Sequence, residues 1–314
     1  MVTPHDCEWL LLDQDDDRAA LLLADRGELD LEAPVAEYWP EFAAAGKAGV
    51  RVRQLLGHTS GLAGWTEHMT LDDIYDTERS TWLLAATTLV GARHRRRLPR
   101  VHPGPSGRRG GACVTGKPLG TFLTDEITTP LGVAQDYYIG TPEEADPQVS
   151  LLIPGFPIHP RGNRFYARAL LNPTATPRDS WTIPWRRASM GALNGHGNAR
   201  GIATAQSVLA SGGAGEVRLM SDAGRRRVLE HETAGLDLVL DIPLRWGMGY
   251  CLNNEIVPAS GGARVAHWGG GGGSMSFVDL DHRFSFGYVP NRWITGAHEQ
   301  DRSVRLLNEL YLAL

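Results

Sequence analysis

Ser60 is the first serine in the chain with a neighbour that could activate its hydroxyl for nucleophilic attack. A serine hydroxyl is a weak nucleophile, so acyl transfer needs an adjacent base, with N–H groups that stabilise the oxyanion. His58, a candidate base, lies two residues before Ser60 in the segment His58-Thr-Ser-Gly-Leu62. This spacing is not the Gly-x-Ser-x-Gly of a nucleophile elbow. We therefore favour a structural loop at Ser60.

Ser274 is the second candidate, because it follows a run of five glycines, Gly269 to Gly273. Such a flexible turn can present N–H donors to an oxyanion. It can equally allow a close backbone approach at the start of a strand. His267, just before Trp268, has a side chain that can titrate near neutral pH. A simple hydrogen-bonded role is the more common one for a single histidine at a strand end, and we favour it.

Metal and cofactor sites are not predicted by any motif in the chain. Asp13, Asp15 and Asp17 resemble the start of a calcium loop, but Arg18 and Ala24 stand where that loop needs glycine and glutamate. No His-Glu-x-x-His, Walker or dinucleotide-binding motif is present. The glycine run is only a weak signal for phosphate. We expect no metal and no cofactor.

The net charge of −5 and the pI near 6.1 argue against nucleic acid or an anionic membrane as a partner. Residues 91–111 are rich in arginine, which is typical of a nucleic-acid arm or of a solvated loop. The segment has no interleaved aromatic residues, so we favour the loop. No apolar run could span a bilayer, and the first residues do not resemble a signal peptide.

The cysteine content favours a reducing compartment. The three cysteines, Cys7, Cys113 and Cys251, are odd in number and far apart, and none forms a Cys-x-x-Cys pair. With no leader sequence predicted, we expect a cytoplasmic protein.

The elements that must position these residues follow from apolar periodicity and capping signals. Helices are expected at 15–27 (ending at Gly27), from Thr70 through Trp82, and at 119–131, 199–210, 221–231 and 300–314. In the last helix an apolar stripe is formed by Val304, Leu307, Tyr311 and Leu314. The runs 274–280 and 284–289 predict an antiparallel hairpin.

An ordered set of motifs resembles the serine β-lactamase-related family, which includes class C β-lactamases, penicillin-binding proteins and esterases of the same fold. The motifs are Leu22–Pro40, Val52–Leu62, Thr115–Gly120, Arg245–Gly249, Trp268–Leu280 and Tyr288–Arg292. The Trp268-Gly269-Gly270 form of the third motif is most similar to the esterase branch. The resemblance implies that these three residues form one wall of the active site, and that the ligand is a small-molecule ester or amide.

The fold implied by the resemblance is α/β (α+β): an antiparallel sheet flanked by helices, plus a helical lobe. We expect one domain over 1–314, with residues 60–200 mostly in the helical lobe and residues 18–59 and 201–314 in the α/β lobe. Met1 comes just before the first motif, so we expect the family's N-terminal strands to be absent or out of frame. Their loss would leave an exposed sheet edge.

The catalytic residues of the family are not found in this sequence. Its Ser-x-x-Lys motif puts the amine one helical turn from the hydroxyl and is expected near Leu10–Asp13. Neither lysine has a serine three residues earlier, since Ala44 precedes Lys47 and Val114 precedes Lys117. No tyrosine is followed two residues later by asparagine or serine. The nucleophile, the base and the tyrosine are all absent.

Two frame-shifts would explain these losses. With suitable synonymous codons, Trp9 to Asp17 read one base later becomes Gly-Ser-Ser-Ser-Thr-Lys-Thr-Met-Thr, which contains the serine and lysine. The same shift turns Arg97 to Arg100 into Gly-Tyr-His. We therefore expect an esterase-like serine hydrolase, impaired as written and possibly a pseudoenzyme. The alternative is a non-catalytic protein that binds small ligands on the same fold, and a third hypothesis is an active hydrolase that uses Ser60 or Ser274.

Overall fold

The structure is a computed structural model, and it describes residues 14–89, 114–155, 163–293 and 301–314. Several predicted features lie outside these residues. They are the expected position of Ser-x-x-Lys near Leu10–Asp13, the arginine-rich segment 91–111 with its shifted tyrosine, and the cysteines Cys7 and Cys113.

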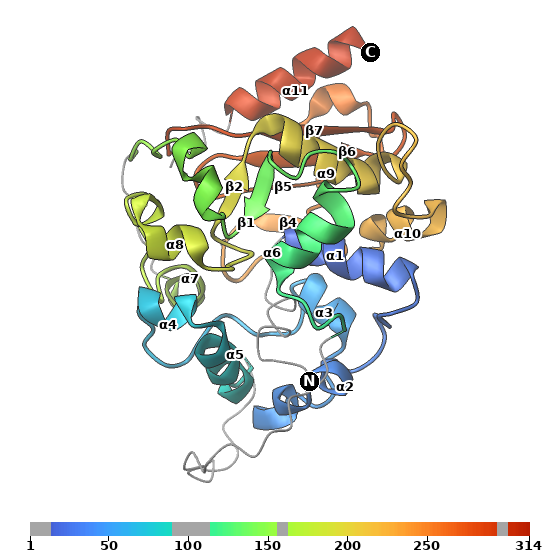
Figure 1. Cartoon of the computed structure of the whole chain (residues 1–314). Helices are drawn as coiled ribbons and strands as arrows, with labels where there is room; N and C mark the ends of the chain where they lie inside the picture. The colour runs from blue at the N-terminus through green and yellow to red at the C-terminus, as the bar shows by residue number, and fades with distance from the viewer. Residues whose placement is uncertain (1–13, 90–113, 156–162, 294–300) are drawn as a thin grey trace.

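The chain forms helices and antiparallel strands, with most of the helices before the strands of the central sheet (Figure 1). The helices are α1 (Gln14–Asp25), α2 (Val35–Tyr38), α3 (Val52–Leu56), α4 (Leu71–Tyr75), α5 (Thr77–Ala86), α6 (Leu119–Phe122), α7 (Arg164–Leu170), α8 (Ile183–Arg187), α9 (Ala199–Ser211), α10 (Asp222–Arg226) and α11 (Asp301–Ala313). The strands are β1 (Tyr137–Ile139), β2 (Gly195–Gly197), β3 (Thr233–Leu236), β4 (Pro243–Trp246), β5 (Val265–Gly269), β6 (Met275–Asp279) and β7 (Phe284–Tyr288). A π-helix (Leu123–Thr128) continues α6, and short 3₁₀ helices lie at Pro40–Gly46, Glu143–Gln148, Asp179–Trp181, Arg227–Leu229, Asn254–Ile256 and Pro258–Ser260.

The central sheet has the order β5-β6-β7, with both pairs antiparallel. The hairpin β3–β4 joins it through Cys251, which forms bridges to both Trp246 and His267. Strand β5 is therefore the edge of the three-stranded ladder, next to this hairpin. Among the described residues, no strand pairs with the outer edge of β7. A separate pair, β1–β2, lies beside α6 and α8 (Figure 1).

Part of the core lies between the sheet and helices α1 and α9. Strand β6 is buried along its whole length, and α9 packs against β6 and β7. Leu21 of α1, Val208 of α9 and Val278 of β6 belong to one apolar cluster. Gly287 permits this packing, because a Cβ there would lie 2.7 Å from the Ala199 carbonyl oxygen. The sheet is thus held rigidly on the helices that flank it.

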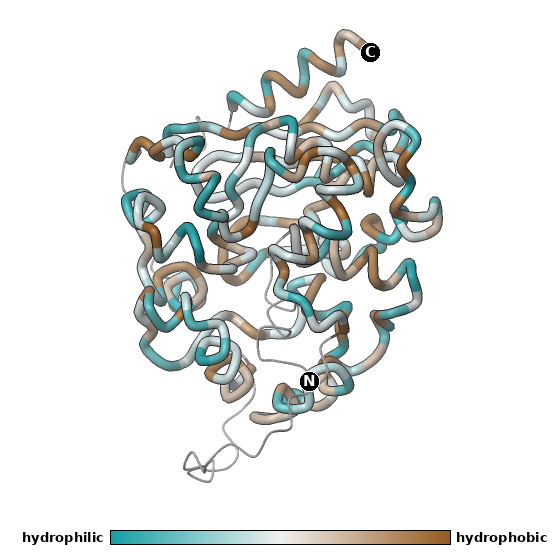
Figure 2. Tube along the Cα trace, in the orientation of Figure 1, coloured by the Kyte–Doolittle hydropathy of each residue, from teal (hydrophilic) through white to brown (hydrophobic). Residues whose placement is uncertain are grey.

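Helix α11 covers the sheet from the other side, at the top of Figure 1. Its residues alternate between hydrophobic and hydrophilic in Figure 2, which is typical of a helix with one buried face. Leu307 is fully buried and Tyr311 is nearly so. The expected stripe does not reach Leu314, which is 69% exposed because the helix ends one residue earlier.

Two predicted helices are divided in the structure. The helix expected from Thr70 to Trp82 stops at Tyr75 and restarts at Thr77, because the Asp76 side chain accepts from the Arg79 N–H and caps the second helix. Trp82, expected on the apolar face, is 58% exposed. The helix expected at 221–231 is only α10 followed by a 3₁₀ turn. The hairpin of β6 and β7 is confirmed, as is Gly27, whose φ of +77° ends α1.

Candidate functional site

The third motif lies at the end of β5. Trp268 and Gly269 complete the strand and pair with Ser276 and Met275. Gly270 begins the turn, and its N–H donates to the Ser274 carbonyl oxygen at 2.9 Å. The Gly273 N–H donates back to the Gly270 carbonyl at 2.9 Å. These two N–H groups are therefore used inside the turn and do not face a ligand.

The glycine run has a structural reason in the ring of Trp293. A Cβ on Gly272 would lie 3.2 Å from that ring, and one on Gly271 would lie 3.7 Å from it. Gly273 also has a φ of +94°, which few other residues adopt. Gly271 and Gly272 thus allow the backbone to approach the Trp293 ring closely, and Gly273 allows the chain to reverse direction.

Three aromatic side chains form a continuous wall beside the third motif. The Trp268 ring lies 4.6 Å from that of Trp246 on β4, and Trp246 stacks on the His58 ring at 4.0 Å. The Trp246 indole N–H donates to Asp237 at 3.2 Å, which fixes the ring. We call His58, Trp246 and Trp268 the aromatic wall.

The start of α1 meets this wall. The Gly249 N–H donates to the Leu56 carbonyl at 3.0 Å, which ties the turn after β4 to the end of α3 just before His58. Gly249 has a φ of +81°, and a Cβ there would overlap the Asp17 carboxylate in the first turns of α1. The first turns of helix α1 therefore pack against the turn that follows Trp246 of the aromatic wall. The expected Ser-x-x-Lys position comes immediately before it in the chain.

The protein environment disfavours the charged form of both histidines of the site. His267 is buried, its Nε2 lies 2.8 Å from the Asn253 carbonyl oxygen, and burial lowers its pKa. Desolvation by the surrounding protein lowers the pKa of His58, and the negative charge of Asp237 raises it by a smaller amount. The His58 side chain keeps an exposed surface, so water moderates this effect. Among the described residues, no carboxylate is hydrogen-bonded to either ring to stabilise its protonated form.

Ser60 and Ser274 are not brought to a base. The Ser60 hydroxyl accepts from the Leu62 N–H at 3.3 Å, and no hydrogen bond joins it to the His58 ring, although both residues are described. Ser274 packs against Gly270 within its own turn. The structure therefore gives neither serine the neighbour that nucleophilic catalysis requires.

Both lysines are engaged elsewhere. Lys47 is fully buried, and its ammonium donates to the carbonyl oxygens of Ala44, Ala85 and Thr87 at 2.6–2.9 Å. Lys117 pairs with Asp125 at 2.8 Å and with Glu126 at 3.4 Å. In this arrangement each amine has a structural partner.

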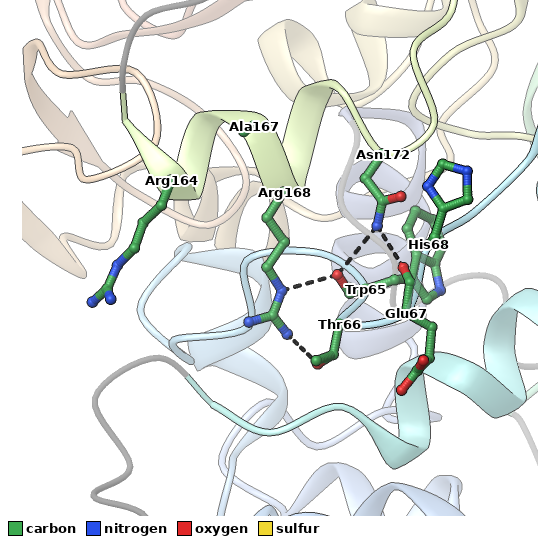
Figure 3. A pocket seen from close by; sticks show the side chains of 8 residues that line it. All are labelled: Trp65, Thr66, Glu67, His68, Arg164, Ala167, Arg168 and Asn172. Atoms are coloured by element: carbon green, nitrogen blue, oxygen red, sulfur yellow. Dashed lines mark hydrogen bonds between the residues drawn. The ribbon is translucent and has the colours of Figure 1, made fainter.

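A hollow with a volume of about 390 Å³ lies between α7 and the loop at residues 65–68 (Figure 3). Its lining consists of Trp65, Thr66, Glu67, His68, Arg164, Ala167, Arg168 and Asn172. We call it the α7 recess. No motif pointed to it, because its residues come from a loop and a helix far apart in the sequence.

Within the described residues, no group of three or more histidine, cysteine or acidic side chains is arranged to hold a metal ion. In the same part of the chain, no helix has the length and apolar character needed to cross a membrane.

Comparison with known proteins gives consistent matches over most of the chain. The family model described as Beta-lactamase matches residues 19–105 and 112–309. Esterase/beta-lactamase LipL of Mycobacterium tuberculosis is 29% identical over 299 residues, which is 87% of this chain and 66% of LipL. The chain thus spans just under two thirds of the length of LipL.

Two solved structures are similar in fold and sequence. A family VIII carboxylesterase matches with a TM-score of 0.75 and 29% identity, over 97% of this chain and 82% of that one. A penicillin-binding protein homologue from Caulobacter crescentus matches with a TM-score of 0.78 and 28% identity, over 99% and 82%. These matches and the antiparallel sheet flanked by helices agree with the expected fold class, and the chain belongs to the beta-lactamase family.

Proposed function

We propose that the chain is an esterase-like member of its family, built for acyl transfer from a small-molecule ester or amide. Trp268, Gly269 and Gly270 would line the ligand cleft, with the aromatic wall packing against the acyl or alcohol group. The strongest support is that the rings of Trp268, Trp246 and His58 contact one another in series beside the start of α1. The similarity to a family VIII carboxylesterase and to Esterase EstB of Burkholderia gladioli favours ester chemistry, whereas LipL is described as both an esterase and a beta-lactamase.

We further propose that turnover is lost or severely impaired in the chain as written. Ser-x-x-Lys is absent from the sequence, and both lysines are bound to other groups. The burial of Asp17 in the first turns of α1 is consistent with the frame-shift hypothesis, because this side chain is only 1% exposed. An aspartate is rarely buried to this extent unless it is paired, and the shifted reading replaces Asp17 by threonine.

The organisation proposed with this function is a single domain with two lobes. Residues 60–200 would form the helical lobe, and residues 18–59 with 201–314 the α/β lobe that supports the aromatic wall. We also propose a cytoplasmic location, because the cysteines are few and widely spaced and the Cys251 thiol is free and buried.

The decisive experiment compares the parent chain with a repaired chain in which both shifts are reversed. We expect no turnover of p-nitrophenyl butyrate by the parent and no labelling by a fluorophosphonate probe. The repaired chain should gain both, and alanine in place of its restored serine at position 11 should abolish them. Labelling of the parent at Ser60 or Ser274, with turnover lost on substituting that serine, would overturn the proposed impairment.

A non-catalytic binding role is the second candidate, favoured by the aromatic wall together with the absence of Ser-x-x-Lys from the sequence. Saturable binding of a non-hydrolysed ester by the parent, weakened at least tenfold by Trp268→Ala, would support it. A matched control is Trp82→Ala, because that ring is exposed away from the wall. Absence of both binding and repairable turnover would refute both functions.

A further inference from the structure

The α7 recess is built by two segments that hydrogen bonds hold together. Arg168 Nε donates to the carbonyl oxygens of Gly64 and Trp65 at 3.1 and 3.0 Å. The Asn172 amide donates to the carbonyls of Trp65 and Glu67, and its oxygen accepts from the Met69 N–H at 2.8 Å. These bonds fix the recess before any ligand arrives, which lowers the entropic cost of binding. Its volume of about 390 Å³ is typical of a small-molecule site.

The charge of Arg168 is the unusual feature of the recess. All its hydrogen-bond partners are neutral: the two carbonyls and the Thr66 hydroxyl, at 2.7 Å from Nη2. Among the described residues, no carboxylate lies within ion-pair distance of this half-buried guanidinium, and burial lowers its pKa. A guanidinium has five N–H donors in a planar fork. Only Nε and Nη2 of Arg168 donate to these partners, so further N–H groups of the guanidinium can donate to an anion. A carboxylate can accept two parallel N–H bonds from a guanidinium.

Arg164 adds a second positive charge one helical turn away, where i and i+4 side chains are neighbours. Its guanidinium lies 4.7 Å from the Phe165 ring, and no hydrogen bond or ion pair to a described residue holds it. Both arginines project from the same side of α7, whereas the Glu67 side chain extends away from Arg168 (Figure 3). The α7 side of the recess therefore attracts a negative group.

Part of the recess offers an apolar surface beside its polar groups. Trp65 and Ala167 belong to its lining, and the Trp65 indole N–H is fixed by the Ser80 carbonyl at 2.8 Å. A ligand with a carboxylate at one end and a small apolar body would satisfy both parts.

We propose that the α7 recess binds a small carboxylate with an apolar body, separately from the ester cleft. Arg168 holds the carboxylate, Arg164 supports it electrostatically, and Trp65 packs against the body. This binding does not require a catalytic serine, so it is testable whether or not the proposed function holds.

The test is calorimetric titration of the full chain with benzoate, using neutral benzyl alcohol as the matched ligand. We expect saturable benzoate binding, at least tenfold weaker binding of benzyl alcohol, and a loss of about tenfold or more in Arg168→Gln. Because Arg168 also holds the loop, Arg164→Gln is the second variant, and it should weaken benzoate severalfold without changing the unfolding midpoint.

Arg178→Gln is the matched control, since Arg178 also lies over an aromatic ring, that of Trp181 at 5.6 Å, outside the recess. Its benzoate affinity should equal that of the parent. Equal affinities for benzoate and benzyl alcohol, no saturable benzoate binding, or equal losses in Arg164→Gln and Arg178→Gln would each overturn the proposal.

Discussion

Replacing Lys47 by methionine removes a buried positive charge that three backbone oxygens hold. The ammonium donates to the carbonyls of Ala44, Ala85 and Thr87, and its charge lies 5.2 Å from the Phe42 ring. The last two carbonyls lie at the end of α5, so the lysine joins this helix to the 3₁₀ segment Pro40–Gly46. Burial lowers the pKa of Lys47 from 10.5 to about 8.

The size of the effect follows from two opposing contributions. Each orphaned buried carbonyl costs about 1–3 kcal/mol, whereas loss of the buried charge returns part of its desolvation free energy. We expect Lys47→Met to lower the free energy of unfolding by about 2 kcal/mol at pH 7. The pKa difference corresponds to about 3 kcal/mol. This value of about 3 kcal/mol is an upper limit for the gain on deprotonation. A neutral amine has only two N–H groups, so one of the three carbonyl oxygens loses its hydrogen bond.

The pH dependence gives the sharper test. Between about pH 8 and pH 10.5 the unfolded chain binds more protons at Lys47 than the folded chain, so the parent is stabilised as the pH rises. The methionine variant lacks this gain, and all other titrating groups are common to both proteins. Urea unfolding at pH 7.5, 9 and 10.5 should show the stability difference widening by up to about 3 kcal/mol. A difference that stays constant or shrinks over this range would refute the reasoning.

Three further predictions concern other parts of the fold. Tyr311→Phe removes the O–H donated to the fully buried Asp279 carboxylate and should cost about 1.5–3 kcal/mol in urea unfolding; an unchanged midpoint would contradict it. Gly249→Ala places a methyl group against Asp17 at a positive φ, so the Tm should fall, with partial recovery when Asp17→Ala is added; strict additivity would contradict the contact. Trp246→Phe keeps a ring in the aromatic wall but loses the indole hydrogen bond, which should cost about 1 kcal/mol; no loss of stability would show that this bond does not matter.

The elements predicted well are those with one buried face. Helices α9 and α11 and the hairpin of β6 and β7 were expected because apolar side chains recur at the period of the element. The division at Asp76 was missed because its side chain can cap a helix only once the chain has turned there. The hairpin β3–β4 was also missed: three of the four residues of β3 are exposed, so little alternation marks it.

The candidate site was only partly visible in the sequence. Resemblance singled out Trp268 and its glycines, but composition and spacing alone do not. The stacking of Trp246 on His58 depends on a turn and a helix end that are far apart in the chain. That no carboxylate of the described residues pairs with Arg168 likewise cannot be read from local sequence, because an acidic residue far away in the chain could have reached it. Such contacts are set by tertiary packing.

The contrast between the two lysines has a practical consequence. Lys47 is sealed in the interior, whereas the Lys117 side chain is 40% exposed. Apart from the terminal amine, a succinimidyl dye or a solid support would therefore attach to the folded protein at one position only. Pairing with Asp125 raises the pKa of Lys117, so coupling should be slow near neutral pH and faster in alkaline buffer. The fold thus provides a single defined handle for immobilisation or for distance measurements by fluorescence.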